Sequence, residues 1–194
     1  MKSILNFNLG NIYKSKISFS NMRKIIIIGT LHAGLTPENE LQEVIEKFNP
    51  DQLLVEIAEE DIKNGKIDSY SPEMIFAYNW AKKCGIKVNG FDSKINVLKE
   101  GMTEKDNQLV IEEQKRIIKN FNWKDMNKLT NLRKLDTDSA KELTDPKKEA
   151  KRESELLENI KNAMISDGSI MIITGSGHLG FLGKHIKDAF FPFR

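Results

Sequence analysis

The feature that most constrains the fold is a run of four isoleucines, residues 25–28, which stops at Gly29. β-Branched side chains favour extended backbone. A continuous apolar run without alternation is typical of a strand whose two faces are both buried, as in a parallel sheet covered by helices. The run therefore predicts a central strand of a layered α/β domain.

Strand and helix signals alternate along the rest of the chain. Apolar runs at 52–57, 86–92 and 169–174 predict three more strands, and residues 36–39 and 71–73 each combine a capping residue with an early proline. At the first of these helix starts we expect Thr36 to be the cap and Pro37 the first helical residue. The alternation predicts an α/β fold with a mainly parallel or mixed central sheet flanked by helices.

Residues 103–166 are predicted to be helical and charged. Apolar residues at helical spacing indicate helices around 109–118, 129–135 and 156–164. The polar stretch 136–147 contains a proline, and we interpret it as a mobile connection between the last two. A final helix is expected to follow residues 175–180 and to end near Phe190.

The first 22 residues differ in composition from the rest. They are basic, rich in serine and asparagine and free of acidic residues, and they lack the apolar core of a secretory signal. We interpret residues 1–22 as a flexible basic tail or a mis-assigned start, with Met22 as the true beginning; a transit peptide shares the acid-poor composition. Residues 23–194 are expected to form a single α/β domain.

The net charge of +2 is unevenly distributed. Residues 1–37 hold five Lys or Arg and no acid, which leaves a mildly acidic body. Its basic residues form no stripe with interleaved aromatic residues, so no nucleic-acid partner is expected. No apolar stretch reaches the roughly 18–20 residues that span a bilayer, so we expect a soluble, cytoplasmic protein without a transmembrane segment. The one cysteine, Cys84, excludes a disulfide framework and is expected to be a small core residue.

Reactive side chains recur where the predicted strands end. His32 follows the first strand, Glu56 ends the second, Asp92 closes the third and His178 follows the fourth. Because parallel strands share their carboxyl edge, where open α/β sheets bind ligands, these four are expected to meet in one crevice. The third histidine, His185, lies among lysines of the last helix and is expected to be solvated.

Each of these residues also has a structural interpretation. A histidine in a strand-to-helix loop can cap a helix or bond a carbonyl group. Glu56 in a buried strand must find a partner or stay protonated, and a structural salt bridge would satisfy it. Asp92 can initiate a turn. The sequence alone leaves these alternatives open.

Residues 175–180, Gly-Ser-Gly-His-Leu-Gly, match the spacing of a dinucleotide-binding loop. Such a loop needs a βαβ unit and an acidic residue further along, and only 14 residues follow Gly180. We therefore expect no dinucleotide cofactor. Gly175 and Gly177 are interpreted as allowing a tight turn that exposes His178.

The Gly-Thr-Leu-His sequence at residues 29–32 resembles the G-x-x-H motif of the TraB/PrgY/GumN/Tiki family, which belongs to a superfamily with erythromycin esterases and haem-binding ChaN proteins. Residues 50–56, 90–92, 152–153 and 175–180 are similar to further motifs of that family, and together the matches cover roughly residues 24–183. The resemblance implies an erythromycin esterase/ChaN-like fold. It also implies a site with His32, Glu56, His178 and Arg152 as catalytic residues, supported by Asp92, Gly29, Gly175 and Gly177.

Three functions are compatible with such a site. In a metal-dependent peptidase or esterase, His32, Glu56 and His178 would hold a divalent ion (Mn, Co or Zn). In a metal-free hydrolase, one histidine would activate water while Arg152 stabilises developing charge. In a regulatory protein of the pheromone-shutdown type, the crevice would bind a peptide or small ligand without turnover. The partner is expected to be a peptide or small-molecule substrate, and the oligomeric state stays open.

Overall fold

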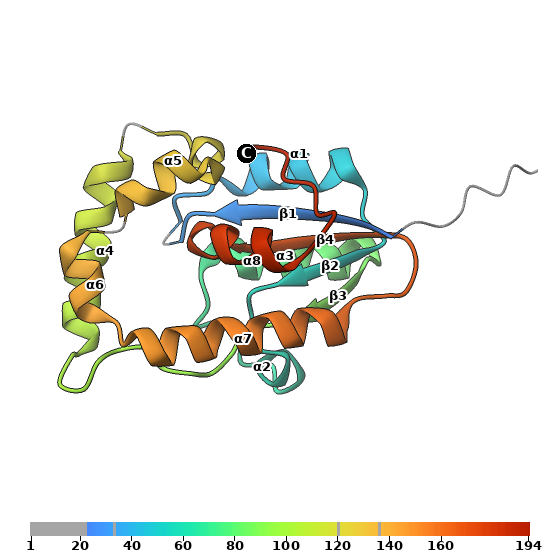
Figure 1. Cartoon of the computed structure of the whole chain (residues 1–194). Helices are drawn as coiled ribbons and strands as arrows, with labels where there is room; N and C mark the ends of the chain where they lie inside the picture. Colours follow the sequence, from blue (N-terminus) through green and yellow to red (C-terminus); the bar gives the residue numbers. More distant parts are fainter. Residues whose placement is uncertain (1–22, 33, 120, 136) are drawn as a thin grey trace, which may run out of the picture.

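The computed structural model describes residues 23–32, 34–119, 121–135 and 137–194, so the predicted tail at 1–22 lies outside the described residues. Four strands form one sheet in the order β1-β4-β2-β3, and every pairing between them is parallel (Figure 1). The predicted α/β fold is confirmed. The strands are β1 (Lys24–Thr30), β2 (Gln52–Val55), β3 (Lys87–Gly90) and β4 (Ser169–Gly175).

Two helical layers cover the sheet. Ile26 and Ile28 of β1 pack toward α1 (Glu38–Phe48) and α3 (Pro72–Cys84). Ile25 and Ile27 point the other way, toward α7 (Pro146–Ala163) and α8 (Leu179–His185). All four isoleucines are at most 6% exposed, so the burial of both faces that the sequence predicts is confirmed.

The outer edge of β1 is covered by the C-terminal segment rather than by a fifth strand. The N–H of Ile27 donates to the carbonyl of Phe190 (2.9 Å), and the N–H of Phe190 donates to the carbonyl of Ile25 (2.8 Å). The last helix therefore ends at His185, earlier than predicted, because the following chain pairs with the sheet. This pairing satisfies an edge that would otherwise offer unpaired backbone groups.

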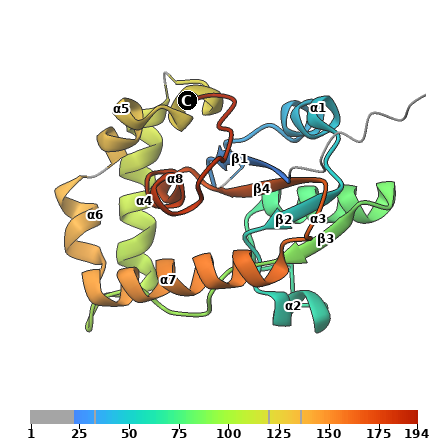
Figure 2. The ribbon, with the colours of Figure 1, turned by 45° about the vertical axis from the view of Figure 1, so that its right-hand side comes forward.

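Further helices lie around these layers. The helix α2 follows β2, whereas α4 and α6 lie beyond the carboxyl ends of the strands in both views (Figures 1 and 2). No helix among the described residues is both long and apolar enough to cross a membrane. The remaining helices and 3-10 turns are α2 (Glu59–Lys63), α4 (Glu104–Ile118), α5 (Leu129–Leu132), α6 (Asp138–Leu143), η1 (Trp123–Asn127), η2 (Arg133–Leu135) and η3 (Ser176–His178).

The mobile connection predicted for residues 136–147 is wrong where the structure describes it. The hydroxyl of Thr137 caps α6, and the carboxylate of Asp145 accepts the N–H groups of Lys147 (2.8 Å) and Lys148 (3.4 Å) to cap α7. Pro146 is the first residue of α7, where its missing N–H costs nothing. The proline marks a helix start instead of a break.

Two other local expectations differ from the structure. α1 begins at Glu38, because the hydroxyl of Thr36 accepts the N–H of Leu31 (2.8 Å) and donates to its carbonyl (3.1 Å). Thr36 therefore closes the loop after β1 and does not cap a helix. Cys84 is exposed and is no core residue, since the buried stripe of α3 ends at Ala81. His185 is exposed, as predicted.

Truncation of a central isoleucine tests how much this burial contributes. We expect Ile27→Ala to lower the free energy of unfolding by about 2–5 kcal/mol, the range for large-to-small changes in packed cores. Urea denaturation monitored by circular dichroism measures the change. Leu109→Ala is the control, because Leu109 is 64% exposed and its truncation should change stability by less than about 0.5 kcal/mol. Equal effects of the two variants would contradict the packing described here.

Candidate active site

The sheet topology changes direction at the carboxyl end of β4. The chain leaves β1 toward α1 on one face of the sheet, whereas it leaves the adjacent β4 toward α8 on the opposite face. β4 is also adjacent to β2. Neighbouring strands whose following segments diverge in this way create the ligand-binding position of open α/β sheets.

A buried carboxylate, Glu56, directly follows β2 at this edge and is only 5% exposed. Its Oε2 accepts hydrogen bonds from the hydroxyl of Thr174 (2.6 Å) and the N–H of Gly175 (2.7 Å). Its Oε1 accepts a hydrogen bond from Nη2 of Arg152 (3.0 Å) and lies 3.4 Å from Nε2 of His178. The predicted need of Glu56 for partners is therefore met by groups from β4, η3 and α7.

The charges of this cluster depend on one another. Burial alone would raise the pKa of Glu56, but the positive charges of His178, His32 and Arg152 hold that pKa well below its usual range. Conversely, burial lowers the pKa of His178, but the negative charge of Glu56 and the hydrogen bonds to Glu153 and Glu56 together outweigh burial and raise that pKa to about 9. His178 therefore carries a proton at neutral pH and directs it toward Glu56.

Arg152 joins the third strand to the cluster. Its Nη2 also donates to Oδ1 of Asp92 (2.7 Å), two residues after the end of β3, and its Nη1 lies 3.2 Å from Nε2 of His178. That last contact is a hydrogen bond only when His178 is neutral. When both are cationic, Glu56 lies against both and holds them together. Burial raises the pKa of Asp92 against the opposing effect of Arg152.

His32 occupies the same edge through a different partner. Its Nδ1 lies 2.7 Å from Oε1 of Glu73 and 3.1 Å from the hydroxyl of Ser71. The imidazole side chain is 51% exposed, whereas that of Glu73 is fully buried. Desolvation lowers the pKa of His32. The hydrogen bond to Glu73 and the charge of Glu56 act in the opposite direction and together have the larger effect, so the pKa is raised above its ordinary value.

Glu73 is the principal residue that the sequence analysis missed. We interpreted it only as an acidic residue of a helix start. The available signal was its position on the buried stripe of α3, four residues before Ala77 and eight before Ala81. An acid on such a stripe needs a specific partner. Thr174, the other missed residue, was predicted as the last residue of the fourth strand, without a role.

The supporting glycines differ in what they permit. A Cβ on Gly175 would come within 2.5 Å of Nε2 of His32, so the imidazole can lie against the end of β4 only because this residue is glycine. A Cβ on Gly29 would lie 2.6 Å from Cδ1 of Leu179. Gly177 has open space around it, so the geometry gives no steric reason for glycine there.

The side chains predicted as metal ligands are arranged differently from a metal centre. Both oxygens of Glu56 already accept hydrogen bonds, and the guanidinium of Arg152 occupies the position next to Oε1 of Glu56 (3.0 Å) and Nε2 of His178 (3.2 Å). A divalent ion at that position would face two cations. Within residues 23–32, 34–119, 121–135 and 137–194, no three His, Cys, Asp or Glu side chains are grouped to hold an ion. We therefore assign no chemical step to a metal, and metal binding stays a prediction.

Comparisons with known proteins identify no relative of this chain. No family model, no curated protein and no solved structure matches the chain. The resemblance to the TraB/PrgY/GumN/Tiki family is therefore untested. The assignment of a function depends on the geometry of the site itself.

The coupling between Glu56 and His178 predicts how stability depends on pH. The folded pKa of His178 is about 9 and exceeds the ordinary value of 6.5. The folded chain therefore binds more protons than the unfolded chain between these values, and the stabilisation by His178 is lost as the pH rises through about 9. We expect the free energy of unfolding to fall by an amount on the order of 2 kcal/mol between pH 6.5 and 9.5.

Urea denaturation at several pH values measures this dependence, and His178→Gln should flatten it. NMR titration of the imidazole gives the second readout, in which Glu56→Gln should lower the pKa of His178 by at least about one unit. A pKa near 6.5 in the unmodified protein would overturn the assignment of a charged His178.

Proposed function

We propose that the chain is a metal-free hydrolase of ester or amide bonds in which His32 activates the attacking water. The observation that carries this proposal is the 2.7 Å hydrogen bond between Nδ1 of the half-exposed His32 and the fully buried Glu73. A buried carboxylate on one ring nitrogen fixes the tautomer and leaves the other nitrogen as the base. Among the described residues, no group bonds to Nε2 of His32.

The reaction follows from these positions. Nε2 of His32 takes a proton from water while the water oxygen attacks the substrate carbonyl carbon. Glu73 stabilises the imidazolium that forms. The tetrahedral intermediate then collapses, and the leaving alcohol or amine takes the proton from His32, so that the base is regenerated.

The second group of charges supports the same reaction. The side chain of Arg152 is 21% exposed and that of His178 15%, so both are largely buried and still reach solvent. Glu56 fixes their positions before substrate binds. Cationic donors held in advance near a carbonyl oxygen stabilise the oxyanion without reorganisation.

Replacement of His32 tests the role of the base. We expect His32→Gln to lower kcat/KM by at least about 100-fold, the usual contribution of a general base, on a panel of p-nitrophenyl esters and fluorogenic peptides. His185→Gln is the matched control, because His185 is exposed outside the site, and its activity should equal that of the unmodified protein. Circular dichroism confirms that both variants fold.

Glu73→Gln separates the positioning role of Glu73 from a purely structural one. The base acts in its neutral form, so kcat/KM should rise with pH through the raised pKa of His32. Without the charge of Glu73, this transition should move to lower pH and the plateau should decrease by about 10-fold or more. A lower plateau with an unchanged transition would leave Glu73 a structural residue only.

Two outcomes favour the other functions that the sequence allows. Loss of activity with a chelator and its recovery with Mn, Co or Zn would restore the metal-dependent hydrolase. Activity of the natural protein that survives double replacement of His32 and His178 would favour a non-catalytic binding protein. Hydrolysis that is insensitive to chelators and abolished by His32→Gln agrees only with the metal-free enzyme.

A further inference from the structure

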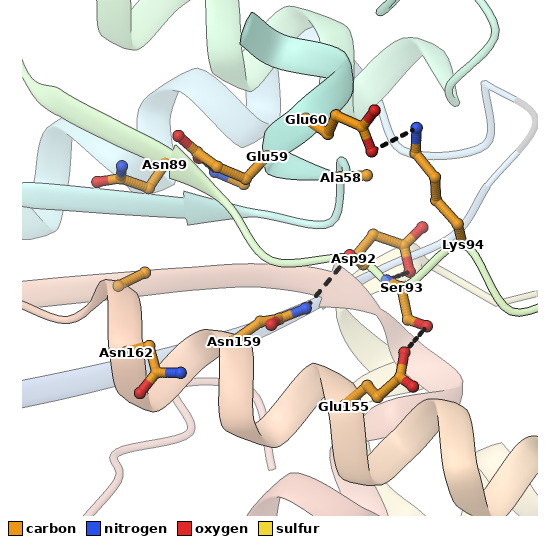
Figure 3. A pocket seen from close by; sticks show the side chains of 12 residues that line it. Ala58, Glu59, Glu60, Asn89, Asp92, Ser93, Lys94, Glu155, Asn159 and Asn162 are labelled. Carbon is orange, nitrogen blue, oxygen red and sulfur yellow. Dashed lines mark hydrogen bonds and ion pairs between the residues drawn. The ribbon is translucent and has the colours of Figure 1, made fainter.

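A polar cleft of about 540 Å³ lies between α7 and the segment that joins β2 to α2 (Figure 3). Its lining comes from the start of α2, the end of β3, the loop at 92–94 and one side of α7. In Figure 3, Glu155 and Asn159 of α7 point toward the loop that holds Asp92 and Ser93, and Glu59 and Glu60 of α2 lie on the other side of that loop. The volume lies within the range of small-ligand sites.

This cleft adjoins the candidate active site through Asp92 and α7. Asp92 lines the cleft and also binds Nη2 of Arg152 at 2.7 Å. Along α7, residues 152, 155, 159 and 162 follow one another at spacings of three and four, so they share one face of the helix. That face leads from the guanidinium of Arg152 to the cleft.

The charge of the cleft favours a cation. Glu59, Glu60, Asp92 and Glu155 contribute four carboxylates, against the single ammonium of Lys94. Lys94 is already paired, since its Nζ lies 3.2 Å from Glu60 and 2.9 Å from Asp61. Asp92 is paired with Arg152 (2.7 Å) and Glu59 with Lys63 (3.7 Å). Glu155 is therefore the lining carboxylate that has no cationic partner among the described residues, and its charge would repel an anionic ligand.

The polarity of the lining restricts the ligand further. Its apolar side chains are the methyl groups of Ala58 and Ala163, and no aromatic ring lines the cleft. A nucleobase or another aromatic group would find no aromatic ring to stack on. A hydrophilic group that donates hydrogen bonds fits such a lining.

Existing hydrogen bonds leave acceptors for that group. Nδ2 of Asn159 donates to the carbonyls of Phe91 (3.2 Å) and Asp92 (3.4 Å), which leaves its amide oxygen as the acceptor. Oε2 of Glu155 accepts the hydroxyl of Ser93 (2.6 Å), so its second oxygen is the one left for a ligand. In the described part of the chain, neither remaining oxygen has a hydrogen-bond donor.

We propose that this cleft binds an ammonium or guanidinium group of the substrate, so that the enzyme cleaves esters or amides that carry a basic side chain or amine. The specificity part rests on the proposed hydrolase activity. The binding part does not depend on it. Glu155 and Asn159 would contact the cation directly, and Asp92 would lie between this group and the cationic floor of the active site.

A binding experiment tests the cleft without any turnover. The ¹⁵N-labelled full chain is titrated with N-acetyl-lysine amide, N-acetyl-arginine amide and the neutral N-acetyl-norleucine amide, and the side-chain amide signals of Asn159 and Asn162 are followed by NMR. We expect the two cationic probes to shift both signals, with weaker binding in 0.5 M salt. Norleucine amide should shift neither.

Charge removal supplies the specific variant. Glu155→Gln keeps an oxygen for the hydroxyl of Ser93 but removes the charge, and it should weaken binding of the cationic probes at least about fivefold. Glu158→Gln is the matched control, because Glu158 is an exposed residue of α7 that does not line the cleft, and it should leave binding unchanged. Equal binding of lysine and norleucine amides, or equal effects of the two variants, would overturn the proposal.

Hydrolysis assays then test the specificity. In Glu155→Gln, the preference for substrates with a basic group over neutral ones should fall at least about fivefold, through KM and not kcat. If His32→Gln remains fully active while the cationic probes still bind, the proposed catalysis fails and the cleft stands. If hydrolysis requires His32 but shows no preference for basic substrates, the specificity fails and the catalysis stands.

Discussion

The buried carboxylate of Glu56 is the interaction on which the carboxyl edge of the sheet depends. It accepts hydrogen bonds from Thr174 and Gly175 at the end of β4 and from Arg152 on α7, and it lies against His178 on η3. A charge this deeply buried is costly unless every lone pair is occupied. Removal of one partner would leave the others unbalanced, so these elements hold their positions together.

The parallel sheet explains why these groups meet at all. Residues 56 and 174 are 118 positions apart, and the hydrogen bond between them exists because β2 and β4 are neighbours in register. The crossover through α3, β3 and α7 brings Asp92 and Arg152 to the same edge. β4 lies between β1 and β2, so His32 and Glu56 reach the cluster from its two sides.

Much of this arrangement was predictable, and the exceptions have physical reasons. The isoleucine run and the spacing of helix signals were sufficient for the α/β fold, and strand ends predicted His32, Glu56, Asp92 and His178 because parallel strands share one edge. Strand order was not predictable, since alternation does not say which strands pair. Glu73 escaped notice because a local helix-start pattern accounts for an acid in a first turn, whereas its partner His32 is 41 residues away. The start of α7 at Pro146 was missed because proline both starts and breaks helices.

The pair of Glu73 and His32 is the feature that supports the proposed active site over a purely structural network of ion pairs. Glu56 and its partners would stabilise the fold even in a protein without activity. Glu73, however, is fully buried, and its one side-chain partner with a charge in the described part of the chain is the half-exposed imidazole of His32. Its Oε2 has no partner among the described residues. Packing gains nothing from an acid at that position of α3, where an apolar residue would extend the stripe of Met74, Ala77 and Ala81. Residues that lower the stability of the fold and make no compensating structural contact are concentrated at functional sites. The effect that this geometry explains is the orientation of His32 by its hydrogen bond to Glu73.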